Sequence, residues 1–129
     1  MRIIIVKKLF ILIISLFYYS CSDLFLTEKI IECNIDEPEY TFDSDIKPII
    51  DQYCISCHRS NYSAANLNLS EYNQFNISKY FVPGDTTQGE ILNRINDKND
   101  PMPPIWVGTM DENSIQIIKK WILECAIEN

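Results

Sequence analysis

The chain has 129 residues, with 18 Asp and Glu against 11 Lys and Arg, and a net charge of −7. This length allows one small domain. The acidic balance argues against a nucleic-acid-binding protein, because affinity for phosphates comes from Lys and Arg side chains. It suits docking against a basic patch on a partner protein.

Residues 1–20 have the pattern of a signal peptide of the bacterial lipoprotein type. Three positive residues precede an apolar run at 9–19, and the small Ser20 stands before Cys21. The run is about half of the ~20 residues that a membrane-spanning helix needs. We expect cleavage before Cys21 and acylation of its thiol, with ordinary cleavage or an uncleaved anchor as alternatives. All three place the domain outside the cytoplasm, in the periplasm or at the cell surface.

The remaining chain divides into an acidic tether or arm at 21–41 and one domain at 42–129. Cleavage would leave eight Lys and Arg and a net charge of −10. Few segments alternate as strands do, and no repeat is present. The domain is therefore predicted to be mostly helical.

The first predicted helix runs to Tyr53. Apolar residues recur at i, i+3, i+4 and i+7 from Ile46, which is one face of an amphipathic helix. Ser44 or Asp45 can cap it, and Pro48 is tolerated because it lies in the first turn. A motif with two cysteines follows at the C-terminal end.

The middle of the domain carries weaker signals. A short helix is predicted near 72–75, and the stretch 82–85 (VPGD) is typical of a turn. Thr87 and Glu90 have the spacing of a capping box for a short helix at 91–95.

The last helix has the clearest pattern. It follows an extended loop, predicted from three prolines at 101–104. Asp111 can serve as its N-cap, with Met110 and Ile115 as a hydrophobic staple. One face of this helix is apolar, with Ile115, Ile118, Trp121, Ile122 and Cys125.

The stretch 54–58 (CISCH) is the main functional signal. A zinc site would need two more ligands, and Cys33 and Cys125 each stand alone in the sequence. A dithiol redox site usually lies in a βαβ context, whereas this motif follows a helix. In the C-x-x-C-H pattern, both thiols bind a haem covalently and the histidine, here His58, ligates the iron. We predict one haem c per chain, attached through Cys54 and Cys57, and keep zinc and dithiol chemistry as alternatives.

A haem needs a second axial ligand, and the sequence restricts the choice. His58 is the only histidine, so methionine is the other common ligand for an electron-transfer cytochrome. Met1 leaves with the signal peptide, and Met110 is explained by the staple. We favour Met102, in the proline-rich loop, although most methionines simply fill the core.

The five cysteines can then be assigned. Cys21 is expected to be acylated, and Cys54 and Cys57 are expected to attach the haem. Cys33 and Cys125 then remain. In an oxidising compartment this remainder favours a disulfide, with two free thiols as the alternative. The bond would close a loop of about 90 residues and stabilise the fold by about 4 kcal/mol in the chain-entropy model.

Several short motifs follow one another across residues 43–127. They are Asp45-Ile46-Lys47-Pro48-Ile49, the CISCH motif, Leu67-Asn68-Leu69, Pro83-Gly84-Asp85, Leu92-Asn93-Arg94-Ile95, Met102-Pro103-Pro104 and Ile118-Lys119-Lys120-Trp121-Ile122. This order resembles the small single-haem c-type cytochrome domains of exported bacterial proteins. The resemblance implies a class I cytochrome c-like fold, with three to five short helices around one covalently bound haem and with N- and C-terminal helices that cross.

The resemblance also implies residue roles. Trp121 would pack the helix crossing, and Arg94 would approach a haem propionate or stay exposed. Two features depart from the family: the polar loop 59–66 lacks the usual glycines, and Cys125 stands where glycine is frequent. The haem-pocket candidates are Tyr53, Leu67, Leu69, Tyr72, Ile91, Leu92, Ile95 and Pro103.

The predicted function is a membrane-tethered electron carrier without enzymatic activity, whose partners are redox proteins that dock through a basic patch. One alternative is a structural or binding lipoprotein that uses CISCH for zinc or a disulfide. A haem peroxidase-like enzyme is disfavoured, because no second histidine is available for acid–base chemistry on the distal side.

Overall fold

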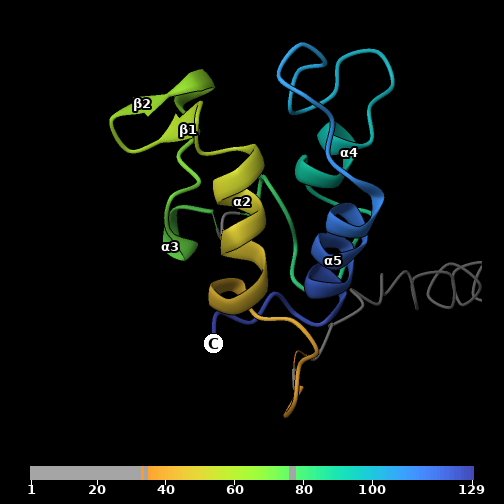
Figure 1. Cartoon of the computed structure of the whole chain (residues 1–129). Helices are drawn as coiled ribbons and strands as arrows, with labels where there is room; N and C mark the ends of the chain where they lie inside the picture. The colour runs from red at the N-terminus through yellow and green to blue at the C-terminus, as the bar shows by residue number, and fades with distance from the viewer. Residues whose placement is uncertain (1–32, 34, 76–77) are drawn as a thin grey trace, which may run out of the picture. The chain divides into compact units, whose positions relative to one another are not determined.

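The computed structural model describes residues 33, 35–75 and 78–129, and this part of the chain is mainly helical (Figure 1). The predicted signal peptide, Cys21 and most of the tether lie outside it. Within the described ranges, no helix is long and apolar enough to cross a membrane. The elements are a π-helical turn η1 (Phe42–Ile46), α2 (Lys47–Tyr53), β1 (His58–Arg59), β2 (Tyr62–Ser63), a 3₁₀ turn η2 (Ala64–Asn66), α3 (Tyr72–Phe75), α4 (Ile91–Ile95) and α5 (Glu112–Leu123).

The first helical segment begins earlier than the sequence predicted. Thr41 is its N-cap, with its Oγ1 accepting the Ser44 N–H at 3.4 Å. Asp45 accepts the Thr41 N–H at 2.9 Å, as in a capping box. The prediction of Ser44 or Asp45 as N-cap was therefore wrong. The wider turn of η1 lies just before Pro48, which has no N–H and whose ring crowds the carbonyl four residues earlier.

Helix α5 forms as predicted. The Asp111 side chain accepts the Ser114 N–H at 2.9 Å and caps the helix. Met110 and Ile115 are both buried, as a hydrophobic staple requires. Four residues of the predicted apolar face, Ile115, Ile118, Trp121 and Ile122, are buried on α5. Cys125 is also buried, but it lies beyond the end of the helix with a φ of 69°, so its predicted place on the helix face was wrong.

The turn at 82–85 is confirmed, whereas the capping box of α4 is not. The Asp85 N–H donates to the Val82 carbonyl at 2.9 Å, and Gly84 has the positive φ of 80°. Thr87 donates its N–H and hydroxyl to Asp85, at 2.7 and 2.6 Å. Glu90 takes the N-cap position without a side-chain cap. Thr87 is thus engaged by the turn, because Asp side chains readily bond backbone two residues on.

Trp121 is at the centre of the core. Its ring lies 6.0 Å from that of Phe42, 6.0 Å from Phe75 and 5.0 Å from Phe81, measured between centroids. Its indole N–H donates to the Ile127 carbonyl at 2.9 Å, so the buried polar atom is satisfied. One side chain therefore connects η1, α3 and α5.

The N-terminal helical segment and α5 touch near both of their ends and run in opposite directions (Figure 1). At one end Phe42 contacts Trp121. At the other the Tyr53 hydroxyl donates to Asp111 at 2.9 Å. The resemblance implied that these helices cross; the structure shows that they are in contact and antiparallel.

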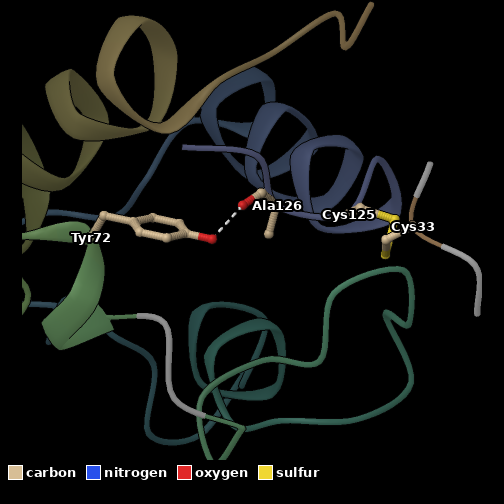
Figure 2. The surroundings of a disulfide bond; sticks show 4 residues. All are labelled: Cys33, Tyr72, Cys125 and Ala126. Carbon is tan, nitrogen blue, oxygen red and sulfur yellow. Dashed lines mark hydrogen bonds between the residues drawn. A yellow bond between two sulfur atoms is a disulfide. The ribbon is translucent and has the colours of Figure 1, made fainter. Parts of the chain in front are cut away.

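Figure 2 shows a disulfide between Cys33 and Cys125, the two cysteines that the sequence analysis left over. Cys125 and Ala126 have φ values of 69° and 53°, the left-handed conformation in which helices often end at glycine. The Ala126 carbonyl accepts the Tyr72 hydroxyl at 2.9 Å (Figure 2). Cys125 thus occupies a glycine-type position, from which its sulfur forms the disulfide with Cys33 in the N-terminal arm.

The cap at Asp111 predicts a pH dependence of stability. Hydrogen bonds from the Ser114 hydroxyl, the Ser114 N–H and the Tyr53 hydroxyl lower its pKa from 3.8 to about 2. A lowered folded-state pKa stabilises above the unfolded value and loses this effect as pH falls. We expect this stabilisation to be complete above pH 3.8 and to disappear toward pH 2. In the Asp111→Asn variant the free energy of unfolding should change less with pH across this range. Urea unfolding at several pH values measures it.

Ser114→Ala is the matched control, because it keeps the carboxylate and removes its strongest donor. In this variant the free energy of unfolding should fall less steeply between pH 3.8 and pH 2 than it does in the wild-type protein. A wild-type slope in Asp111→Asn would contradict the assignment.

Candidate functional site

A cavity of about 210 Å³ lies inside the helical unit. Most of its lining is apolar, as in typical cofactor sites. Seven of the predicted site residues line it: Cys54, His58, Leu67, Leu69, Ile91, Ile95 and Met102. The fold therefore brings the cysteine–histidine motif and the proline-rich loop to one apolar space.

The backbone around His58 holds its imidazole in place. The His58 N–H donates to the Cys54 carbonyl at 3.0 Å, and its own carbonyl accepts the Leu69 N–H at 2.8 Å. The ring nitrogen Nδ1 lies 3.2 Å from the Leu67 carbonyl. Metal-binding histidines usually donate one ring N–H to such an acceptor. Within the described part of the chain the other ring nitrogen, Nε2, has no hydrogen-bond partner, so it is available to a metal.

The two cysteines of the motif are reduced and differ in position. Cys54 lines the cavity, and burial raises the pKa of its thiol to about 12. Cys57 is half-buried beside Ser56, whose hydroxyl lies 3.7 Å from the sulfur, and does not line the cavity. A thiol–disulfide site requires a lowered thiol pKa, so the burial of Cys54 argues against the dithiol alternative.

Two methionines line the cavity. The Met102 N–H donates to the Arg94 carbonyl at 2.9 Å, which ties the proline-rich loop to the end of α4. Met110 lines the same space from the residue before the cap of α5. The staple therefore does not remove Met110 as a candidate ligand, and the choice between the two sulfurs calls for an experiment.

Some predicted pocket residues lie elsewhere. Leu92 is buried in the core, whereas Ile91 and Ile95, four positions apart, share the helix face that lines the cavity. The Tyr53 hydroxyl binds Asp111, and the Tyr72 hydroxyl binds the backbone near the disulfide. Pro103 is buried but does not line the cavity.

Other residues line the cavity without having been predicted. Ile50 precedes Cys54 by one helical turn, and that spacing could have identified it. Lys79, which lies 3.7 Å from Glu90, also belongs to the lining. So does Arg94, which the resemblance placed near a haem propionate or at the surface and which lies 2.9 Å from Asp100. The remaining additions are Ala65, Phe75, Tyr80, Glu90, Met110 and Ile118.

The loop after His58 has more structure than predicted. It forms the short hairpin β1–β2, followed by η2. Ala65 and Asn66 have φ values of 56° and 57°, a conformation that glycine adopts most easily. Ala65 and Asn66 thus adopt a glycine-type backbone conformation in a loop that has no glycine.

The side chains present fit a haem better than zinc. Cys33 and Cys125, which a zinc site would have to recruit, are bonded to each other. Across 33, 35–75 and 78–129 there is no cluster of three or more His, Cys, Asp or Glu side chains that could hold a metal ion. By contrast, an apolar cavity with one imidazole, two thioethers and an adjacent thiol has the donor set of a covalently attached haem.

Comparison with known families agrees with this assignment. Residues 54–105 match the family model described as Planctomycete cytochrome C. The match includes the CISCH motif and Met102, and it excludes α2 and α5. No curated protein and no solved structure gives a significant match. This similarity supports a cytochrome c-like domain in the chain and suggests electron transfer with a c-type haem.

Proposed function

We propose that this chain is a membrane-tethered electron carrier with one haem c, ligated by His58 and Met102. The observation that carries the proposal is the cavity to which both ligands and Cys54 contribute. When bound, the haem supplies a one-electron couple between ferrous and ferric iron. The chain supplies the attachment, the two axial ligands and an apolar surrounding.

Each ligand has structural support in this chain. The Leu67 carbonyl 3.2 Å from Nδ1 orients the imidazole of His58 and increases its basicity. Met102 offers a neutral thioether, which raises the reduction potential relative to a second histidine. Lys79 and Arg94 contribute positive charge to the lining, where haem carboxylates can bind.

The tether and the partner belong to the same proposal and rest on the sequence. Acylation of Cys21 would hold the domain at a membrane outside the cytoplasm. The net charge of −10 that remains after cleavage favours a redox partner with a basic face, since complementary charge raises association rates.

The test is the absorption spectrum of the full chain, exported from a host that attaches haem c. We expect a c-type α-band after reduction, reversible reoxidation, and no binding of carbon monoxide at rest. Carbon monoxide binding by the untreated protein would favour the enzymatic alternative, which needs an open iron position. Protein without an α-band would contradict the proposal.

A further inference from the structure

The loop between α4 and α5 exposes three consecutive large apolar side chains. Ile105, Trp106 and Val107 are 63%, 87% and 53% exposed. Within the described ranges the other large hydrophobic residue with comparable exposure is Leu123, at 49%. We call residues 105–107 the apolar tip. Adjacent exposed apolar residues of this size commonly mark an interaction site.

The apolar tip is presented by an ordered turn. The Val107 N–H donates to the Pro104 carbonyl at 2.8 Å. Gly108 follows with φ at 121°, where a side chain would be strained. In Figure 1 the loop extends past the ends of α4 and α5. The apolar tip is therefore part of a hydrogen-bonded turn, and its side chains are exposed.

The apolar tip lies close to the cavity in the chain but is not part of its lining. Met102 and Met110, on either side of it, line the cavity, and residues 105–107 do not. Trp106 is four residues from Met102, a span of at most about 14 Å of extended chain. A protein bound to the apolar tip would thus come close to the cavity.

Charge identifies the kind of partner. Residues 96–112 carry four carboxylates, at Asp97, Asp100, Asp111 and Glu112, and one lysine, Lys98. Arg94 pairs with Asp100 from outside this range, and the segment remains net negative with Arg94 included. A net negative segment on both sides of the apolar tip repels an anionic lipid surface and a second copy of this acidic chain, whereas it attracts a basic protein. Exposed Trp is also the residue most typical of binding hot spots.

We propose that the apolar tip is the docking site for a redox protein whose apolar patch is surrounded by Lys and Arg. The inference rests on the proposed electron-transfer function and adds the surface through which the electron leaves or arrives. One electron passes between the two proteins, one oxidised as the other is reduced, and no bond or proton changes.

The test uses a lysine-rich c-type cytochrome as the probe and the full haem-loaded chain. Calorimetry measures binding at low and high salt, and stopped-flow absorbance measures electron exchange. We expect Trp106→Ala to weaken binding and slow exchange by about tenfold or more, the effect of truncating an aromatic hot spot. Leu123→Ala, the matched exposed control on α5, should change neither. Exchange with a small cationic ruthenium complex should stay the same in both variants.

Other outcomes would overturn the inference. If Trp106→Ala binds the probe as tightly as the wild-type protein does, the apolar tip is not the docking site. Selective loss of vesicle binding would assign the apolar tip to a lipid surface, and selective loss of a dimer in sedimentation would assign it to a second copy. An altered haem spectrum in Trp106→Ala would mean that the tryptophan covers the haem. Absence of haem from the wild-type chain would instead refute the proposed function.

Discussion

Met102→Ala is expected to open the sixth coordination position of the haem-loaded protein. The ferrous form should then bind carbon monoxide, which the wild-type protein should exclude, and the reduction potential should fall. The reason is that Met102 provides a thioether to the cavity lined by His58, and a methionine ligand raises the potential. Absorbance with and without carbon monoxide, together with a redox titration, measures both effects.

Met110→Leu is the control, because Met110 lines the same cavity and is buried. A swap of similar volume typically costs less than about 1.5 kcal/mol and removes the sulfur. If Met102 is the ligand, this variant keeps the wild-type spectrum and excludes carbon monoxide. If Met110→Leu instead binds carbon monoxide and Met102→Ala excludes it, Met110 is the ligand.

Replacing Cys33 and Cys125 by alanine is expected to lower the free energy of unfolding by about 4–5 kcal/mol. The bond joins residues 92 positions apart in the sequence, so its loss releases a long loop in the unfolded chain. The disulfide also attaches the N-terminal arm to the end of α5. In this arm Glu39 pairs with Lys120, and the Glu39 N–H donates to the Glu124 carboxylate. Urea unfolding of both proteins measures the difference.

The backbone conformation at Cys125 allows a second comparison in the same experiment. Its φ of 69° disfavours alanine relative to glycine by about 1–2 kcal/mol. Cys33→Ala combined with Cys125→Gly should therefore be more stable than the double alanine variant and less stable than the wild-type protein. Equal stability of the wild-type protein before and after reduction of the disulfide would contradict the role of the bond.

The sequence predicted the fold best where several local signals agreed. At α5 the Asp111 cap, the staple and the apolar face all indicated the same helix, and the structure has it. At Thr87 one spacing suggested a capping box, but Asp85, two residues away, competes for the same hydroxyl and N–H. At 58–66 the chain turns through Ala65 and Asn66, which carry no glycine signal for a left-handed conformation.

The site shows the same division. The CISCH motif has a fixed spacing that follows from its chemistry, and a local pattern was enough to find it. Tyr53 could not be placed from sequence, because its hydroxyl bonds Asp111, 58 residues away. Leu92 could have been placed, because helical periodicity separates it from the face that carries Ile91 and Ile95. Cavity residues from distant segments, such as Lys79 and Ile118, depend on tertiary packing.

The most direct test is the mass of the exported, denatured chain beside that of a Cys54→Ser, Cys57→Ser variant. A covalently attached haem survives denaturation, whereas a zinc ion is lost when its site unfolds. We predict that the wild-type protein exceeds its polypeptide mass by one haem, after allowance for acylation of Cys21, and that the variant lacks this addition. A wild-type protein without the added haem, from a host that attaches haem c to other proteins, would contradict the assignment of CISCH.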